Sequence, residues 1–494
     1  MPNRQVRRIL AAGAIGAMSL SAALNQPVKT KTGLVSGVPG RDVSITAFKG
    51  MPFAAPPVGN LRWRAPQPAA DWPGVRKAAQ FGSSCIQNIV TEHKPWTYEF
   101  MTHNEISEDC LYLNVWTGAR AAGEGRPVYL YIYGGANTEG SSAVPVYDGE
   151  GLAKKGVVVV TVNYRLGILG FFAHPELSKE AEYHASGNYA LLDLVAALHW
   201  IHENIAAFGG DPAKVTIGGQ SAGGANVHSL MASPLAKGLF RAAIIESAGG
   251  GSRPLADQEQ AGVKFAESKG ARSLEDLRKM SWKDLTAPQP IRFSSAAVDG
   301  YVLPNPPVEI DVPVLTGTNK HESGATPHPD VTPAAYQEQV RRRYQDLADE
   351  VLALYPATTP NDLAWDTARV SNHRSATAKK KVYTYFWDHA LPGPDADKYG
   401  AFHSSELPYV LSSLAAADRP FTAADQKIAD TMSSYWANFI ATGDPNGKGL
   451  PHWPSAAEKP GFTMEVGDTT APIPVAGSDA KRKLLEKYFA GQDR

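Results

Sequence analysis

Short runs of β-branched and aromatic residues recur along the chain, separated by stretches in which hydrophobic residues follow a helical spacing. The runs at residues 126–133 and 157–164 are almost continuously hydrophobic, which is typical of strands buried on both faces. Further strands are predicted at residues 111–116, 215–217, 241–245, 312–317 and 382–387. Because strands alternate with helical stretches, we expect an α/β fold with a central, mostly parallel, twisted sheet flanked by helices.

Hydrophobic residues three and four positions apart predict an amphipathic helix over residues 188–208 that ends at two glycines. Two regions, 257–285 and 332–370, interrupt the alternation and are interpreted as helical insertions. The second contains the run Arg341 to Arg343, which we interpret as a solvated helix face; a basic docking patch is the alternative. Two more helices are expected at residues 425–442 and 481–489.

Composition restricts the partners of the protein. The 494 residues include 48 basic and 49 acidic side chains, so no global field attracts nucleic acid or an anionic membrane. The chain contains no internal repeat or low-complexity linker. One catalytic domain over residues 24–494 is the simplest organisation.

The N-terminus has the pattern of an export signal. Arg4, Arg7 and Arg8 precede an apolar stretch at residues 9–24 with small residues near its end. A signal peptide over residues 1–23 predicts a periplasmic or secreted protein; a membrane anchor is the alternative. No later segment has about 18 uninterrupted apolar residues, so no stable membrane span is expected after signal cleavage.

Cys85 and Cys110 are the two cysteines of the chain. In an exported protein an even number of cysteines favours a disulfide. Two buried thiols are the alternative.

The strongest chemical signal lies at residues 214–226. A β-branched run leads into Gly219-Gln220-Ser221-Ala222-Gly223 and then into small residues that predict a helix. A serine at such a strand-to-helix turn is held in a strained conformation with its hydroxyl above the sheet. We interpret Ser221 as a nucleophile; a glycine-rich loop that contains a serine by chance is the alternative, because the motif alone is weak.

A serine nucleophile needs a base to take its proton and a carboxylate to orient that base. In this architecture both follow the nucleophile along the chain, the acid first. Glu322 and His403 each follow a predicted strand, in that order. Backbone N–H groups that could hold an oxyanion belong to Gly135 and Ala136, in the turn after another strand, and to Ala222.

These motifs together resemble the type B carboxylesterases, the family that includes the cholinesterases. They follow the family order from about residue 30 to 490 and cover nearly the whole mature chain. The residues that carry the resemblance are Glu108 to Val115, Tyr133 to Ala136, Asn163 to Gly167, Gly187 to Asp193, Phe208 to Pro212, Gly219 to Gly224, Asn319 to Ser323, His403, and Thr442 to Asn446.

The resemblance implies the α/β-hydrolase fold and hydrolysis of a small-molecule ester by a Ser221, Glu322, His403 triad, with no metal or organic cofactor. It also implies three structural pairs, namely the Cys85–Cys110 disulfide and the ion pairs Arg62–Glu108 and Arg165–Asp193. Ser247 matches a family position whose side chain supports the triad acid, Glu322, from outside the triad. Gln220 occupies a position that is Glu in cholinesterases, and it too is expected beside the triad.

Other polar residues have less specific interpretations. His321 precedes the candidate acid and could be mistaken for the base, but family order favours His403. Glu406 is expected to be structural. His199 and His202 lie three apart on a predicted helix, yet no further ligand set accompanies them, so a metal site is disfavoured.

The run Asn137 to Glu139 departs from the family, in which many members carry a large aromatic residue there. It could lie near the pocket mouth and restrict the substrate, or it could form a solvent-facing polar loop. Three functions compete: an exported serine carboxylesterase, a non-catalytic binding homologue, and a lipase or amidase of the same fold. The presence of all three triad residues favours the first.

Overall fold

The computed structural model describes residue 24 and residues 26–322, 331–374 and 381–492; the predicted signal peptide, residues 1–23, lies outside them. Within the described residues the central sheet has eleven strands. In spatial order they are β18 (Thr470–Pro474), β17 (Phe462–Val466), β16 (Val382–Trp387), β15 (Val314–Asn319), β12 (Ala242–Glu246), β11 (Gly210–Gln220), β9 (Arg126–Ile132), β10 (Val158–Val162), β8 (Tyr112–Thr117), β4 (Thr46–Pro52) and β3 (Val38–Pro39).

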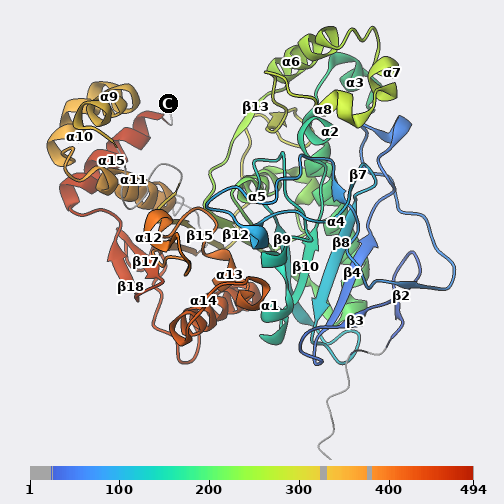
Figure 1. Cartoon of the computed structure of the whole chain (residues 1–494), viewed down its shortest axis with the longest axis horizontal. Helices are drawn as coiled ribbons and strands as arrows, with labels where there is room; N and C mark the ends of the chain where they lie inside the picture. The colour runs from blue at the N-terminus through green and yellow to red at the C-terminus, as the bar shows by residue number, and fades with distance from the viewer. Residues whose placement is uncertain (1–23, 25, 323–330, 375–380, 493–494) are drawn as a thin grey trace, which may run out of the picture.

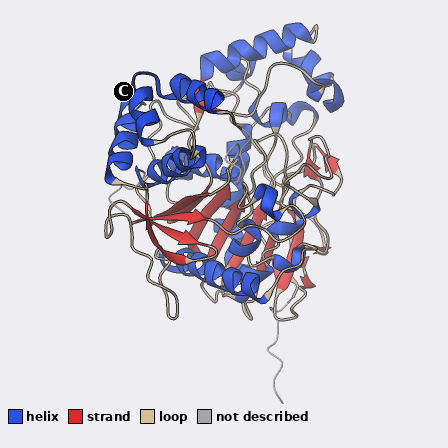
Figure 2. Cartoon of the chain, turned by 60° about the vertical axis from the view of Figure 1, so that its left-hand side comes forward, coloured by secondary structure: helices blue, strands red, loops and turns tan. Residues whose placement is uncertain are grey.

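All neighbouring strands from β17 to β10 run parallel, whereas the two edges are antiparallel. The chain passes from β9 to β10 on one side and then returns to place β11 on the other side of β9. Such a reversal leaves a crevice at the carboxyl ends of the strands, where ligands bind in open α/β sheets. The predicted mostly parallel sheet is confirmed, and Figure 2 shows its twist.

Helices lie on both sides of the sheet (Figure 2). They are α1 (Glu150–Lys154), α2 (Gly167–Phe171), α3 (Pro175–Glu180), α4 (Tyr189–Asn204), α5 (Ala222–Ala232), α6 (Leu255–Ser268), α7 (Leu274–Lys279), α8 (Trp282–Thr286), α9 (Pro333–Tyr344), α10 (Ala348–Leu354), α11 (Pro360–Arg374), α12 (Ala396–Tyr399), α13 (Leu407–Val410), α14 (Ala423–Thr442) and α15 (Asp479–Gln492). Short strands outside the main sheet are β1 (Val28–Lys29), β2 (Leu34–Ser36), β5 (Val75–Lys77), β6 (Ser84–Cys85), β7 (Ile106–Ser107), β13 (Ser252–Pro254) and β14 (Ala296–Val298).

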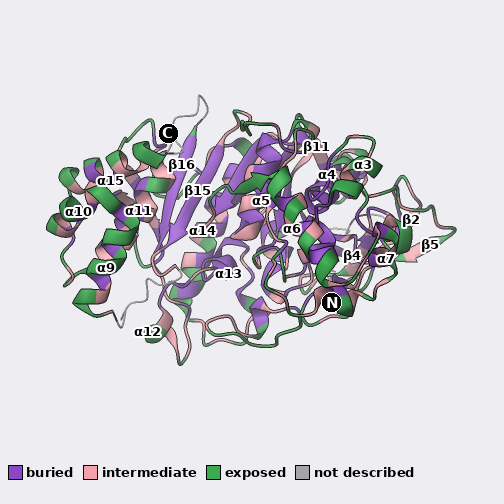
Figure 3. Cartoon of the chain, turned by 90° about the horizontal axis from the view of Figure 1, so that it is seen from above, coloured by how far each residue is buried: buried purple, intermediate pink, exposed green. Residues whose placement is uncertain are grey.

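The long helix predicted before the serine motif is α4. A short 3-10 turn continues it to Phe208, and the segment ends at Gly209, whose φ of 82° suits glycine. The buried strands and the inner sides of α4, α5 and α14 share one large hydrophobic core. Figure 3 shows β15 and β16 as buried over their length.

Both predicted helical insertions are confirmed, and they pack differently. The first forms α6, α7 and α8 and joins the main core through Phe265, Leu277 and Leu285. The second forms α9, α10 and α11, which pack with α15 around a separate small core at one end of the molecule (Figure 1). Arg341, Arg342 and Arg343 are exposed on α9, as expected of a solvated helix face.

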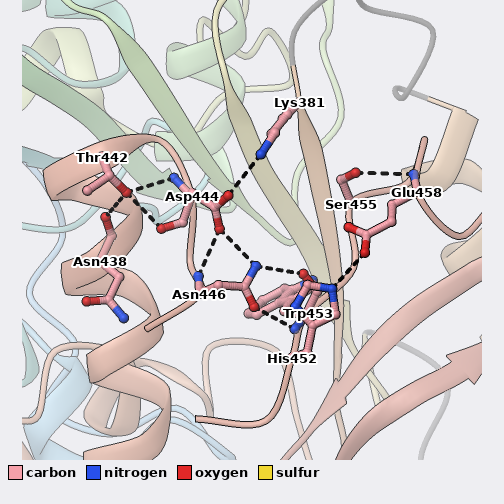
Figure 4. Close-up of polar contacts among 9 residues, drawn as sticks. All are labelled: Lys381, Asn438, Thr442, Asp444, Asn446, His452, Trp453, Ser455 and Glu458. Atoms are coloured by element: carbon pink, nitrogen blue, oxygen red, sulfur yellow. Dashed lines mark hydrogen bonds and ion pairs between the residues drawn. The ribbon is translucent and has the colours of Figure 1, made fainter. Parts of the chain in front are cut away.

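The chain after α14 turns through a polar segment. Asp444 accepts hydrogen bonds from the backbone N–H and the side-chain amide of Asn446 at 3.0 and 2.8 Å, and it pairs with Lys381 at 3.0 Å (Figure 4). Strands β17 and β18 follow; the sequence analysis did not predict them. They are short, and Pro472 and Pro474 in β18 are tolerated because this strand lies at the sheet edge.

Candidate active site

Ser221 lies between the end of β11 and the start of α5. Its φ of 56° and ψ of −125° are unusual for a residue with a side chain, which is the strained turn that the motif predicted. A Cβ on Gly223 would lie 2.0 Å from the carbonyl oxygen of Ile132, and a Cβ on Gly219 would lie 2.6 Å from Gly223. Both glycines are therefore required for the turn to approach β9 closely.

Glu322 and His403 follow β15 and β16 and meet at the same edge of the sheet. His403 Nδ1 pairs with Glu322 Oε2. The other carboxylate oxygen accepts hydrogen bonds at 2.9 Å from Thr318 Oγ1 and from the backbone N–H of Asn319. The carboxylate is therefore fixed by its own strand end while it holds the imidazole.

The electrostatic environment of this pair stabilises its charged form. Burial alone would raise the pKa of Glu322, but the hydrogen bond and charge of His403 outweigh it and the pKa is lowered. Burial alone would lower the pKa of His403, but the hydrogen bond and charge of Glu322 outweigh it and the pKa is raised. The arrangement thus favours an imidazole that can accept a proton on its free nitrogen.

The free nitrogen of His403 is in contact with Gln220. Gln220 Nε2 lies 3.1 Å from His403 Nε2. With Nδ1–H donated to the carboxylate, Nε2 carries a lone pair that accepts the amide N–H. Within the described part of the chain, no hydrogen bond joins Ser221 Oγ to His403. The Gln220 amide therefore contacts the same His403 nitrogen, Nε2, that would accept the Ser221 proton.

The turn after β9 brings the predicted N–H donors to the serine. Gly135 and Ala136 have φ values of 105° and 53°, and both line the same cavity as Ser221. Ala222 is the first residue of α5. Among the described residues, the N–H groups of these three residues have no acceptor within the protein. All three are thus available to bind a negatively charged oxygen.

A layer of buried polar groups lies behind the pair. Ser247 follows β12 with a φ of 51°, and its hydroxyl contributes to the lowered pKa of Glu322, although no hydrogen bond to it is formed within the described residues. Glu246 accepts a hydrogen bond from Trp436 Nε1 at 2.8 Å. Glu406 pairs with the side-chain amide of Asn319, a structural role as expected.

Glu246 was not singled out by the sequence analysis. Burial raises the pKa of both Glu246 and Glu406 to about 8. The signal that could have identified Glu246 is its place directly before Ser247 at the end of β12, where it pairs in register with Gln220. Because their pKa values are raised, the carboxyl groups of Glu246 and Glu406 are largely uncharged below pH 8.

The candidate residues open into one cavity of about 340 Å³. Its lining includes Ser221 and His403, with Trp96, Phe100 and Tyr147 as aromatic walls. Trp96 Nε1 donates to the backbone oxygen of His403 at 3.0 Å. The site therefore combines polar groups at its base with apolar surface for a small organic molecule.

The run Asn137 to Glu139 divides into three different environments. Asn137 is buried; its amide donates to Ser294 O at 3.0 Å and accepts from Asn226 Nδ2 at 2.9 Å. Thr138 and Glu139 are both exposed, and Glu139 also lines the cavity. The pocket-mouth interpretation therefore applies to Glu139, and the surface interpretation applies to Thr138.

The structural pairs implied by the resemblance are confirmed. Cys85 and Cys110 form a disulfide with an S–S distance of 2.07 Å, and Trp96 lies in the loop that it closes. Arg62 and Glu108 form two hydrogen bonds. Arg165 and Asp193 form a fully buried bidentate pair with two contacts of 2.8 Å.

Two other histidines considered from the sequence contact backbone groups. His321 Nδ1 accepts the backbone N–H of Ala401 at 2.8 Å, and His202 contacts Leu239 O at 3.1 Å. The described residues contain no group of three or more side chains that could hold a metal ion. Over the same residues, no helix combines the length and apolar character needed to cross a membrane.

Comparison with known proteins identifies the family of the chain. The model of the carboxylesterase family matches residues 25–351 and 330–486. A fumonisin B1 esterase of Sphingopyxis macrogoltabida is 37% identical over 476 residues, covering 89% of this chain and 86% of that protein. A cocaine esterase of Homo sapiens is 34% identical over 486 residues, covering 87% and 86%.

A solved structure of PNB esterase is similar over nearly the whole chain. The TM-score is 0.77 at 30% sequence identity, and the match covers 93% of this chain and 99% of the other. The family match and the esterase relatives indicate a hydrolase of carboxylic esters. The chain therefore belongs to the carboxylesterase family and is a carboxylesterase with the α/β-hydrolase fold.

Proposed function

We propose that the protein is an exported serine carboxylesterase in which Ser221 attacks the ester carbonyl. His403 takes the serine proton as general base, and Glu322 orients His403 and stabilises the imidazolium. His403 then protonates the departing alcohol, which leaves an acyl group on Ser221. Water, activated in the same way, releases the acid and restores the enzyme.

The N–H groups of Gly135, Ala136 and Ala222 hold the oxyanion of each tetrahedral intermediate. Support comes from their location beside Ser221 and from their lack of acceptors among the described residues. Before the attack, His403 must exchange its Gln220 contact for the serine hydroxyl.

The single observation that carries the proposal is the Glu322–His403 pair at the same cavity as the strained Ser221. An acid-oriented imidazole beside a strained serine suits acyl transfer. A non-catalytic homologue has no need for this strain, which costs on the order of 1–3 kcal/mol.

The proposed organisation is a signal peptide at residues 1–23 followed by one catalytic domain at 24–494. The disulfide supports export, because such bonds persist in oxidising compartments. N-terminal sequencing of protein recovered from outside the cytoplasm tests this organisation. A mature protein that still begins at Met1 would contradict it.

Hydrolysis of 4-nitrophenyl esters and covalent labelling by an organophosphate test the reaction. Ser221→Ala should lower kcat by at least about 10⁴-fold and abolish labelling, because no other hydroxyl lies in the strand-to-helix turn. The matched control is Ser252→Ala, which changes an exposed serine on β13 and should retain both properties.

Three results would contradict the proposed function. Labelling of Ser221→Ala at the wild-type rate would exclude Ser221 as the nucleophile. Absence of turnover across esters of varied acyl length, with no labelling of the folded wild type, would favour a binding protein. A preference for amides, or activation at a triglyceride interface, would assign an amidase or a lipase.

A further inference from the structure

Glu139 is a carboxylate that lines the catalytic cavity without a partner. It lies four residues beyond Gly135, and its backbone N–H donates to Gly135 O at 3.0 Å. Within the described residues its carboxylate has no hydrogen bond and no ion pair, whereas the amide of neighbouring Asn137 is fully engaged. The turn therefore fixes the backbone of Glu139 and leaves its charge facing the cavity.

No cation in the described cavity wall neutralises this charge permanently. The described lining contains neither lysine nor arginine, and its other titratable side chains are His93, Tyr147 and His403. His403 is already paired with Glu322. The ring of His93 stacks on Trp96 with centroids 5.7 Å apart, and in the described lining Glu139 is the carboxylate without a hydrogen bond or ion pair.

The carboxylate is partly desolvated although its side chain remains open to the cavity. Surrounding protein raises the pKa of Glu139, and the nearby His93 lowers it to a smaller extent. A desolvated, unpaired anion interacts more strongly with a bound cation than a fully hydrated one does. Trp96, Phe100 and Tyr147 line the same cavity, and aromatic side chains attract cations.

We propose that Glu139 is a specificity-determining residue that selects esters carrying a positive charge, such as an ammonium group, on the acyl or the alcohol portion. This inference rests on the proposed hydrolysis at Ser221 and names the substrate class of the same site. The charge attracts substrate and transition state alike, so its effect falls mainly on KM. An ester with an anionic group is disfavoured by the same charge.

Two pairs of esters of equal shape test the inference and distinguish the acyl from the alcohol side. The acyl pair is the 4-nitrophenyl ester of 4-(trimethylammonio)butanoate and that of 5,5-dimethylhexanoate. The alcohol pair is the butanoate of 2-(trimethylammonio)ethanol and that of 3,3-dimethylbutanol. Within each pair the members differ by a carbon in place of the charged nitrogen, so the ratio of kcat/KM isolates the charge.

For at least one pair, the kcat/KM of the wild-type enzyme should be roughly tenfold higher for the cationic ester at low salt. This ratio lies between the values that Coulomb's law gives for two unit charges ~6 Å apart in water and at a protein surface. Glu139→Gln keeps the size of the side chain and should bring this ratio close to one. Added salt should reduce the wild-type ratio but not that of Glu139→Gln. Glu338→Gln, which removes an exposed carboxylate on α9, is the matched control and should keep the wild-type ratio.

A wild-type ratio of one or below in both pairs, or an unchanged ratio in Glu139→Gln, would overturn the inference. Both results presuppose that the uncharged esters are hydrolysed, so the proposed reaction would stand. Failure to hydrolyse any of the four esters, together with an unlabelled Ser221, would instead remove the proposed function and the inference with it.

Discussion

Replacing Gln220 by glutamate tests the contact between this side chain and the proposed general base. The two side chains have nearly the same shape, and the Gln220 amide nitrogen lies 3.1 Å from His403 Nε2. In Gln220→Glu a carboxylate oxygen faces that nitrogen. The new charge stabilises the imidazolium form of His403, which is the form that cannot act as a base.

The size of the effect follows from the short distance. Two unit charges ~4 Å apart interact by about 4 kcal/mol at an effective dielectric constant of about 20. The His403 side chain is 19% exposed and already shares its proton with Glu322, so solvent and the first carboxylate reduce the gain. About 1.4 to 2.7 kcal/mol remains, which corresponds to about one to two pH units.

The sign of the pH dependence is fixed because His403 must be neutral to accept the serine proton. The pKa of His403 is already raised by Glu322. A second carboxylate raises it further, so the acid limb of the kcat/KM profile should move to higher pH by at least one unit. Activity should fall most near neutral pH and recover in alkaline solution.

The assay is kcat/KM for an uncharged 4-nitrophenyl ester between pH 5 and 9.5. Gln220→Met is the control, because it removes the N–H donor to Nε2 without adding a charge, so it should move the acid limb upward by less than Gln220→Glu does. An acid limb in folded Gln220→Glu within about 0.3 pH units of wild type would refute the reasoning. In that case either His403 is not the base or the Gln220 contact does not form in solution.

Three stability predictions concern groups around the site, each measured by urea unfolding. Replacing Cys85 and Cys110 together by serine should cost about 3.5 kcal/mol, because the bond closes a loop with a sequence separation of 25; an unchanged midpoint would contradict this. Asp193→Asn should cost about 3–5 kcal/mol, because Arg165 is left buried and unpaired; a loss below 1 kcal/mol would indicate that water reaches the arginine. Burial raises the pKa of Glu246 from 4.5 to about 8. Between these two pH values its carboxyl is uncharged in the native state and ionised in the unfolded state. The free energy of unfolding therefore falls as pH rises through this window. Glu246→Gln should shrink the loss of stability between pH 5 and 8 by on the order of 2 kcal/mol, and an identical pH dependence in both proteins would place the pKa of Glu246 near its ordinary value.

Local sequence patterns were sufficient for much of the fold. Runs of β-branched residues predicted the central parallel strands, because strands buried on both faces require continuous hydrophobic residues. Strand β16 was predicted with the bounds that the structure has. Strands β17 and β18 were missed, because both have only five residues and neither is continuously hydrophobic: β17 includes Thr463 and Glu465, and β18 is an edge strand with two prolines.

The sequence by itself determined the candidate chemistry. The glycines around Ser221 identified the strand-to-helix turn, because only glycine allows this turn to approach β9 closely. Chain order and strand ends identified Glu322 and His403, because the carboxyl ends of parallel strands meet at one edge of the sheet. Candidate roles for these residues could therefore be proposed before any distance was known.

Only the tertiary structure decided what surrounds that chemistry. The contact of Gln220 with His403, and the burial of Glu246 beneath it, depend on strand register between segments far apart in the chain. The run Asn137 to Glu139 looked uniformly polar, yet the positive φ of its first residue directs Asn137 inward while Glu139 reaches the cavity. Local patterns specify a turn and its candidate nucleophile, whereas the direction and the neighbours of each side chain are fixed only when the strands pack together.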